Sequence, residues 1–288
     1  MQSRANMGIY IAPEDPLLAQ RLLWMRDQGL GHIGFDGLRY NDAETYRQIR
    51  AKIEASGLNL QVIHGEVPLV SPEGDDEAVR RGQLGILGRA TGLGAKLVVV
   101  HYRLLTDPAA DVADYDRRMT ETLRWLADEA DARGLSIAVE NVPRHHPFGY
   151  RVDELVAYLA SLNLPNVRLC LDSGHAHLSG LDVAETVRQG GEWLLTTHFH
   201  DNFGVPRGDL TPAQKDRHLA TGLGTINWPS VILALEEIKF PGPIMFEGVR
   251  TIPHGPLPDF ELAGDLTLRN WEQFEKIART MVETGEGE

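Results

Sequence analysis

The sequence predicts a single (β/α)₈ barrel, in which eight parallel strands alternate with helices around one core. Its 288 residues match the length that such barrels commonly use for one domain. Short apolar or β-branched runs alternate with longer amphipathic stretches along the chain. Several short runs, such as LVVV, are apolar without interruption, as strands are when helices cover a parallel sheet. We therefore expect residues 1–288 to form one barrel domain.

The eight expected strands are short and are separated by helical patterns or turns. They cover Met7–Ala12, His32–Asp36, Leu58–His64, Lys96–His101, Leu135–Glu140, Val167–Asp172, Leu195–His200 and Pro243–Glu247. A doubly wound open sheet has the same alternation, but it usually carries a glycine-rich phosphate motif after its first strand. The sequence IYIAPEDP at that position has no such motif, which favours the barrel.

The stretches between these strands have helical spacing and recognisable ends. In Ala113–Arg133 the apolar residues recur every three or four positions. Residues suited to cap a helix flank several stretches: Gly29, Gly57, Gly94 and Gly134 at carboxyl ends, and Asn41 and Asp182 at amino ends. The last helix is expected to cover roughly Leu262 to Glu283.

Composition and charge exclude several classes of protein. With 28 basic and 41 acidic residues, the net charge of −13 argues against affinity for nucleic acid or for an anionic membrane. The one cysteine, Cys170, cannot form an internal disulfide and is expected to pack inside the barrel. Neither a signal-peptide pattern nor an apolar run of membrane-spanning length is present, so we expect a cytoplasmic protein with no membrane partner.

Acidic and imidazole side chains stand at the carboxyl ends of consecutive expected strands. These residues are His64, His101, Glu140, Asp172, His198, His200 and Glu247. In a barrel the carboxyl ends of all parallel strands open at one mouth, so these side chains should converge there. Clustered carboxylates repel one another unless a cation compensates, and carboxylates with imidazoles are ligands for divalent metals. The sequence therefore predicts a metal site, with manganese or zinc preferred and cobalt, iron or magnesium as alternatives.

A long loop, Asn202–Gly224, follows the seventh expected strand and carries further candidate ligands. Asp216 and His218 lie two residues apart within it, and glycines at 222 and 224 allow a tight turn into the next helix. Loops of this length in compact domains are usually functional. We expect the loop to return Asp216 and His218 to the mouth, as ligands or as partners of ligands; an exposed turn is the alternative.

The motifs VEN, LDSGHAH, HFHDN, DRHLATGLGTINW and MFEG together resemble the xylose isomerase-like superfamily of TIM barrels, and within it the sugar phosphate isomerase/epimerase family. The resemblance covers nearly the whole chain. It implies one divalent metal held by Glu140, Asp172, His198 and Glu247. Because His200 shares a strand face with His198, a difference in register could exchange these two residues.

The resemblance also implies an activity on a small carbohydrate. The metal would polarise the sugar carbonyl, and Glu140 and Glu247 would move a proton through a metal-stabilised enediolate, giving isomerisation or epimerisation. Loss of hydroxide from the same species would give dehydration instead. His175, His200 and Arg250 are the candidates for binding the substrate, although Arg250 could equally form a surface ion pair. A metal- or sugar-binding module without turnover would not need both glutamates.

Endonuclease IV, a three-zinc phosphodiesterase of the same superfamily, provides the alternative interpretation. Its ligand set also finds matches here. The additional candidate ligands are His64, His101, His175, Asp216 and His218. Against this alternative stand the charge of −13 and the segment GEVPLVSP after His64, which lacks the aromatic residue that endonuclease IV uses to open the duplex. The sequence does not fix the oligomeric state, so an oligomer remains open.

Overall fold

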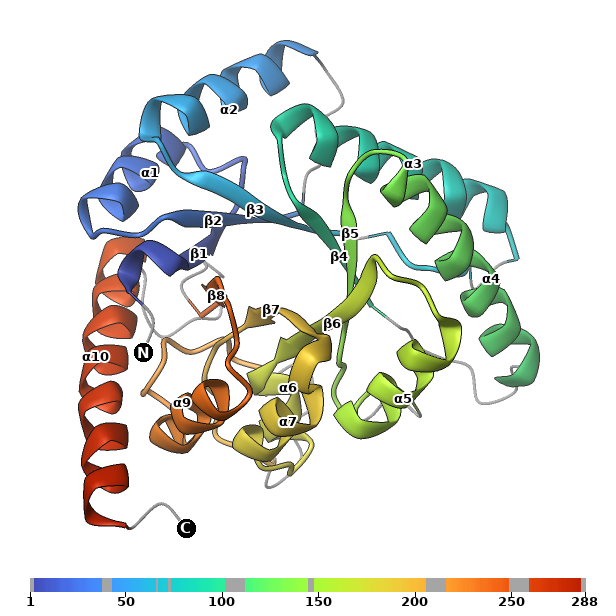
Figure 1. The fold of residues 1–288 in the computed structure, drawn as a ribbon. Helices are drawn as coiled ribbons and strands as arrows, with labels where there is room; N and C mark the ends of the chain where they lie inside the picture. Colours follow the sequence, from blue (N-terminus) through green and yellow to red (C-terminus); the bar gives the residue numbers. More distant parts are fainter. Residues whose placement is uncertain are drawn as a thin grey trace.

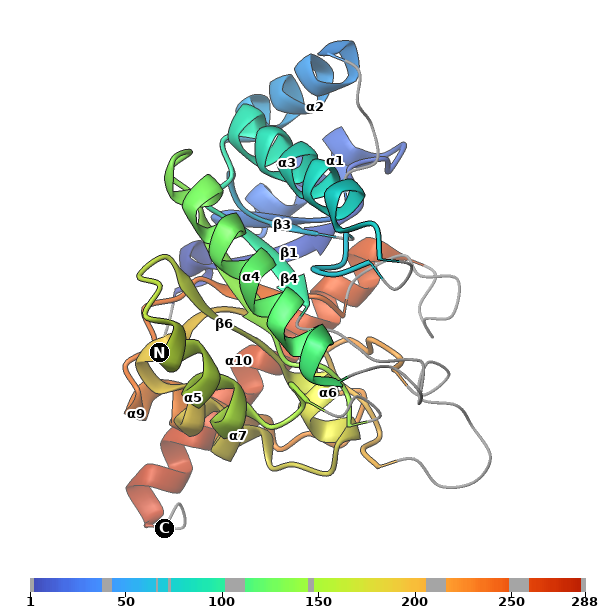
Figure 2. The same ribbon diagram turned by 90° about the vertical axis from the view of Figure 1, so that its right-hand side faces the viewer.

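The computed structural model describes residues 3–37, 43–65, 67–71, 74–101, 112–144, 148–205, 216–248 and 259–285. Strands and helices alternate along the chain, with the strands at the centre of the molecule and the helices outside them (Figure 1). A view turned by 90° shows α3, α4 and α5 lying outside the strands on one side (Figure 2). None of the described helices combines the length and the apolar composition needed to cross a membrane.

Eight parallel strands form a nearly closed barrel. The strands are β1 (Met7–Ile11), β2 (His32–Asp36), β3 (Asn59–His64), β4 (Leu97–His101), β5 (Ser136–Glu140), β6 (Val167–Asp172), β7 (Leu194–His198) and β8 (Ile244–Phe246). Their order is β7-β6-β5-β4-β3-β2-β1-β8, so neighbours in sequence are neighbours in space. Phe199, just after β7, pairs with Phe246 of β8 and joins the two ends of the sheet. The predicted (β/α)₈ fold is confirmed.

Each strand is followed by at least one helix. They are α1 (Leu18–Asp27), α2 (Ala43–Ser56), α3 (Asp76–Leu93), α4 (Val112–Asp131), α5 (Val152–Leu162), α6 (Ser173–Leu178), α7 (Val183–Gly190), α9 (Trp228–Glu237) and α10 (Phe260–Thr284), with short 3₁₀ helices at Arg4–Asn6 and Gly191–Trp193. Asp182 caps α7 by accepting a hydrogen bond from Glu185 N, as predicted. Gly94 ends α3 in the left-handed conformation. Asn41 lies outside the described residues.

The buried apolar side chains form two clusters, one on each face of the curved sheet. The larger cluster packs the strands against the helices. The smaller one fills the barrel interior with residues from six strands: Tyr10, Val62, Leu97, Val99, Ala138, Cys170 and Met245. The position of Cys170 agrees with the expectation that it packs inside the barrel.

The largest difference from the predicted boundaries lies at the end of β7. The sequence predicts a strand to His200, but β7 ends at His198. Beyond it Phe199 donates to Met245 O and accepts from Glu247 N, so the backbone here pairs with β8 instead of β6. Asp201 then pairs in the antiparallel direction with Leu219 of the following loop. The regular strand stops because its backbone groups change partners.

Candidate metal and active site

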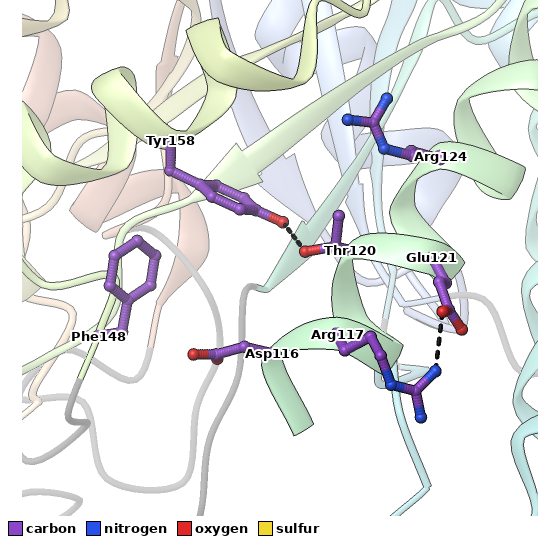
Figure 3. Close-up of a pocket in the computed structure, with 7 residues that line it drawn as sticks. All are labelled: Asp116, Arg117, Thr120, Glu121, Arg124, Phe148 and Tyr158. Atoms are coloured by element: carbon purple, nitrogen blue, oxygen red, sulfur yellow. Dashed lines mark hydrogen bonds and ion pairs between the residues drawn. The ribbon is translucent and has the colours of Figure 1, made fainter. Parts of the chain in front are cut away.

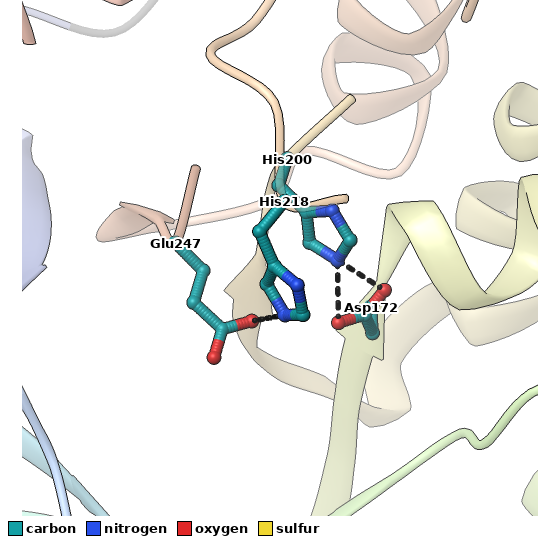
Figure 4. A group of neighbouring side chains, drawn as sticks. All are labelled: Asp172, His200, His218 and Glu247. Atoms are coloured by element: carbon teal, nitrogen blue, oxygen red, sulfur yellow. Dashed lines mark hydrogen bonds and ion pairs between the residues drawn. The ribbon is translucent and has the colours of Figure 1, made fainter. Parts of the chain in front are cut away.

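Four acidic and imidazole side chains gather at the carboxyl ends of β6, β7 and β8. Asp172, His200, His218 and Glu247 each offer one ligand atom, and these atoms lie within 4.8 Å of one another (Figure 4). Asp172, His200 and Glu247 are buried, and the His218 side chain is 12% exposed. The cluster combines two carboxylates with two imidazoles, which is a donor set for manganese, zinc or a related divalent ion.

The position of Asp172 is fixed from several directions. It is the last residue of β6 and also caps α6, where its side chain accepts a hydrogen bond of 2.6 Å from His175 N. Asn141, one residue after β5, accepts from the backbone N of Asp172 at 2.7 Å and donates to its carbonyl at 3.0 Å. Glycine is required at 174, because a β-carbon there would overlap the ring of His200.

His200 connects Asp172 with the loop that follows β7. Its Nε2 lies 3.0 Å from both carboxylate oxygens of Asp172. Its ring stacks on that of His218 with centroids 4.1 Å apart, and His218 Nε2 lies 3.5 Å from Glu247 Oε2. His218 has a φ of 44°, a left-handed conformation that residues other than glycine rarely adopt. The loop therefore brings His218 to the mouth, as the sequence predicts.

Asp201 holds this loop against the barrel. Its buried carboxylate accepts hydrogen bonds from Gly222 N at 2.9 Å, Ile226 N at 3.2 Å and the Trp228 indole at 2.8 Å. The neighbouring Asn202 donates to Asp216 Oδ1 at 3.1 Å. These bonds connect the segment after β7 with the start of α9 and fix both ends of the described part of the loop.

Glu140, at the end of β5, lies at the centre of a second group of imidazoles. Its Oε2 is 3.1 Å from His101 Nε2 and 3.4 Å from His64 Nε2, and the three residues could hold a metal ion together. His64 also lies 3.3 Å from Asp36, through its Nδ1. The register explains this arrangement, because His101 is paired with Glu140 and Asp36 with His64 in neighbouring strands.

His175 and Asp216 form a third contact at the mouth. His175 Nε2 lies 3.1 Å from Asp216 Oδ2, and its Nδ1 lies 2.9 Å from the carbonyl of Asn141. Both ring nitrogens of His175 therefore have protein partners. Asp216 also lies 3.5 Å from His218 Nδ1. The structure thus brings both loop residues, Asp216 and His218, next to the strand-end residues.

His198 contacts different residues of the site from His200. Its Nε2 lies 2.8 Å from the hydroxyl of Tyr10, and its Nδ1 lies 3.1 Å from Glu140 Oε2 and 3.5 Å from Glu247 Oε2. Among the described residues it could share a metal with Glu140 and Cys170, or with His64 and Glu247. It does not belong to the four-residue cluster that contains Asp172.

Burial and mutual attraction shift the pKa values of these groups. Burial raises the pKa of Glu140, but the interactions with His198 and His101 outweigh burial and hold that pKa well below its usual value. Burial lowers the pKa of His200, but Asp172 raises it above the usual value. Burial also lowers the pKa of His175, but nearby carboxylates, Asp172 first among them, raise it well above the usual value. The raised pKa values of His175 and His200 favour protonated rings, whose charge would offset part of the negative charge of the buried carboxylates, whereas burial lowers the pKa of His101.

A divalent cation fits this environment. Oε2 of Glu140 is buried and makes no hydrogen bond among the described residues, although three imidazoles surround it. Buried carboxylate oxygens without hydrogen bonds are costly unless a cation satisfies them. The donor set and this oxygen both agree with metal ligation at the mouth.

A separate cavity lies away from the mouth, between α4 and α5. Its volume is about 360 Å³, and its lining includes Arg117, Thr120, Phe148 and Tyr158 (Figure 3). Thr120 and Tyr158 are hydrogen-bonded to each other at 2.9 Å across it. None of the potential metal-binding groups found among the described residues includes a residue of this cavity. The mouth is therefore the better candidate for the functional site.

Sequence reasoning did not identify four residues that shape the site. Asn141, Asp201 and Asn202 directly follow Glu140 and His200, so their adjacency to strand-end ligands was an available signal. Tyr10 gave no signal, because an aromatic residue in an apolar strand is typical of a core. Arg250, a predicted substrate-binding residue, lies outside the described residues.

Comparison with known proteins agrees with this architecture. Residues 24–266 match the family model of the xylose isomerase-like TIM barrels. The chain is 28% identical to an inosose isomerase of Bacillus subtilis over 54% of its length and 55% of that protein. It is 24% identical to a D-psicose 3-epimerase of Agrobacterium fabrum over 72% of its length and 70% of that protein. With uncharacterized proteins of Sinorhizobium fredii and Methanocaldococcus jannaschii the match spans only 49% and 63% of their lengths.

Solved structures share the fold at lower sequence identity. An L-ribulose 3-epimerase superposes with a TM-score of 0.76 at 19% identity, covering 96% of this chain and 97% of the other. The IolI protein, solved with a bound zinc atom, superposes with a TM-score of 0.74 at 18% identity, covering 93% of this chain and 97% of the other.

Proposed function

Because the chain belongs to the xylose isomerase-like TIM-barrel family, we propose that it is a divalent-metal-dependent isomerase or epimerase acting on a small carbohydrate. Its relatives include inosose isomerases and ketose 3-epimerases. The observation that carries the proposal is the convergence of Asp172, His200 and Glu247 within ligand distance of one another. Glu140 contributes a second glutamate, whose Oε2 makes no hydrogen bond to the part of the chain that the structure describes.

The residues that would hold the metal are Glu140, Asp172, His200 and Glu247. His200 is preferred to His198 because its group includes both Asp172 and Glu247, whereas His198 lies near Glu140 and Glu247 in two groups that do not include Asp172. Manganese and zinc both fit this set of oxygen and nitrogen donors, and the IolI structure contains zinc. When bound, the ion would polarise a substrate carbonyl and so acidify the neighbouring C–H.

The two glutamates would move the proton. The lowered pKa of Glu140 keeps its carboxylate ionised at neutral pH, as a base requires. Glu247, which follows β8, is the partner that would return a proton to the substrate. Return to the neighbouring carbon gives isomerisation, and return from the opposite face gives epimerisation. His175, the candidate for binding a substrate hydroxyl, has its two ring nitrogens engaged by Asn141 and Asp216, so it would have to release Asp216 to bind the substrate.

Exchange of a substrate hydrogen with solvent tests this proposal. Protein loaded with manganese or zinc is incubated in deuterated water with a panel of ketoses and inososes, and deuterium next to the carbonyl is measured by NMR. We expect incorporation with at least one substrate, its loss on chelation, and its return when the metal is restored. Exchange that survives complete metal removal would contradict metal dependence.

A phosphodiesterase with several zinc ions is the second candidate function. The observation that favours it is the separate group of His64, His101 and Glu140, together with the contact between His175 and Asp216. The net charge of −13 opposes it, because such enzymes must bind phosphates. Zinc-dependent cleavage of an abasic-site duplex, lost in His175→Ala, would favour this candidate over the isomerase. We expect no cleavage.

A further inference from the structure

Asn202 is buried in the segment that follows β7, and each of its four polar atoms has a partner. Its backbone N donates to Asp201 Oδ1 at 2.9 Å, and its carbonyl accepts from Thr225 N at 2.9 Å. Its side chain reaches the returning part of the loop, at Asp216 and Arg217. Asn202 therefore joins the end of the barrel to both described parts of the loop.

The two side-chain contacts fix the orientation of the Asn202 amide. Oδ1 accepts from the backbone N–H of Arg217 at 2.9 Å, and Nδ2 donates to Asp216 Oδ1 at 3.1 Å. A backbone N–H can only donate, so the amide oxygen faces Arg217 and the amino group faces Asp216. Glycine at 174 leaves room for this amino group, because a β-carbon there would lie 2.6 Å from Nδ2. An aspartate at 202 would instead place a second carboxylate against Asp216, so the position requires an amide.

Hydrogen bonds hold the backbone on both sides of His218. Before it, Arg217 N is bonded to the Asn202 amide, and after it, Leu219 pairs with Asp201. His218 lies between these bonds with a φ of 44°. The bonds therefore maintain the backbone conformation from which the His218 ring reaches the cluster at the mouth.

Asp216 uses different oxygens for Asn202 and for His175. Its Oδ1 lies 3.1 Å from Asn202 Nδ2, whereas its Oδ2 lies 3.1 Å from His175 Nε2. The bond to Asn202 can therefore persist when His175 releases Asp216. The amide thus holds the carboxylate at the mouth whether or not His175 is engaged by it.

We propose that Asn202 is a positioning residue: its amide holds Asp216 and the backbone of Arg217, and so places Asp216 beside His175 and His218 beside the metal-binding cluster. The role depends on a neutral side chain that donates on one side and accepts on the other. Asn202 itself touches neither the metal nor the substrate in this role. The consequence for the substrate rests on the proposed function.

Two variants at this position test the requirement for an amide. Asn202→Asp keeps the shape of the side chain but replaces the donor with a carboxylate oxygen, and it should weaken zinc binding about tenfold in calorimetric titration. The double variant Asn202→Asp/Asp216→Asn restores the hydrogen bond with donor and acceptor exchanged. Its zinc affinity should return to within about threefold of the wild type. Asn227→Asp makes the same chemical change at the exposed cap of α9 and is the matched control, expected to equal the wild type.

Two further measurements separate positioning from general damage to the fold. Asn202→Asp combined with His218→Ala should bind zinc no more weakly than His218→Ala alone, because both changes remove the contribution of the same ring. With zinc saturating, Asn202→Asp should raise KM about tenfold and lower kcat less, because the structure shows no hydrogen bond from Asn202 to Glu140 or Glu247 among the residues it describes.

A readout without metal or substrate completes the test. In the metal-free protein the urea midpoint should fall in Asn202→Asp and recover in the double variant. Zinc affinity of Asn202→Asp at or above the wild-type value would overturn the proposal, as would a double variant that binds zinc as weakly as Asn202→Asp or does not fold. If no sugar is turned over or no metal is bound, the proposed function fails, while the urea midpoints still decide whether the amide holds Asp216.

Discussion

The imidazole rings of His200 and His218 lie face to face, with centroids 4.1 Å apart and planes inclined by 14°. His218 reaches this position from a loop residue whose φ is 44°. A left-handed conformation at a residue with a β-carbon costs about 1 kcal/mol or more, and such strain is concentrated at functional sites. The positive φ therefore indicates that the loop gives up some stability to bring His218 next to Asp172, His200 and Glu247.

Two substitutions of His218 separate the ring from the backbone strain. Both His218→Ala and His218→Gly should weaken metal binding about tenfold, because each removes the same imidazole. The glycine variant should be more stable than the alanine variant by about 1 kcal/mol, because glycine adopts a positive φ without strain. Metal titration and chemical denaturation measure the two effects. Equal stability of the two variants would show that the backbone at 218 is not strained.

Replacement of either glutamate tests the acid/base assignment. Glu140→Gln and Glu247→Gln should each lower turnover of the sugar substrate at least about a hundredfold, because each removes a positioned acid or base while keeping the side-chain shape. Steady-state kinetics with saturating metal measure the loss. Glu283→Gln, on the exposed end of α10, is the matched control and should behave as the wild type. Near-normal turnover by either site variant would remove that residue from the mechanism.

The metal-free protein should lose stability as the pH rises. The pKa values of His175 and His200 are raised in the folded state, so their contribution is complete below the unfolded value of about 6.5 and is lost as the pH rises through the folded values. The free energy of unfolding measured in chelator should therefore fall as the pH rises above about 6.5. Bound metal should reduce this fall, because it replaces the protons as the balancing charge.

A variant without one of these histidines provides the control for the pH experiment. His200→Gln removes a titrating group, so the stability of the metal-free variant should depend less on pH than that of the wild type. Stability of the metal-free wild type that stays constant or increases over the same pH range would contradict the charge balance described here.

Asp201 should contribute more to the stability of the fold than to catalysis. Asp201→Ala leaves the buried donors of Gly222, Ile226 and Trp228 without their acceptor, and we expect a loss of about 3 kcal/mol or more. Asp182→Ala removes an exposed carboxylate that caps α7 through one bond and should cost about 1 kcal/mol. Urea denaturation compares them. A loss for Asp201→Ala no larger than that for Asp182→Ala would contradict this role.

The sequence was sufficient to predict the barrel and the end of the barrel at which the polar side chains meet. β2 and β6 have the predicted bounds, and each ends on the aspartate at which the sequence predicts the end of the strand. Strand-end positions such as His101 and Glu140 converge because parallel strands in register place them side by side. This convergence follows from topology alone.

The sequence did not determine which histidine after β7 joins Asp172. His198 and His200 both point inward, but the backbone leaves the β6 pairing at Phe199 and places His200 nearer the opening. That change depends on hydrogen bonds to Met245 and Glu247, which are distant in sequence. The hydrogen bond between Tyr10 and His198 could not be predicted for the same reason, because the two residues are distant in sequence and meet across the barrel interior.

Elemental analysis of the purified wild-type protein tests the central claim most directly. The account predicts about one manganese or zinc ion per chain, retained through dialysis and lost in His200→Gln. Protein that retains no divalent ion, and binds none when manganese or zinc is added, would contradict the account. Two or three zinc ions per chain would contradict the single-metal isomerase and favour the phosphodiesterase.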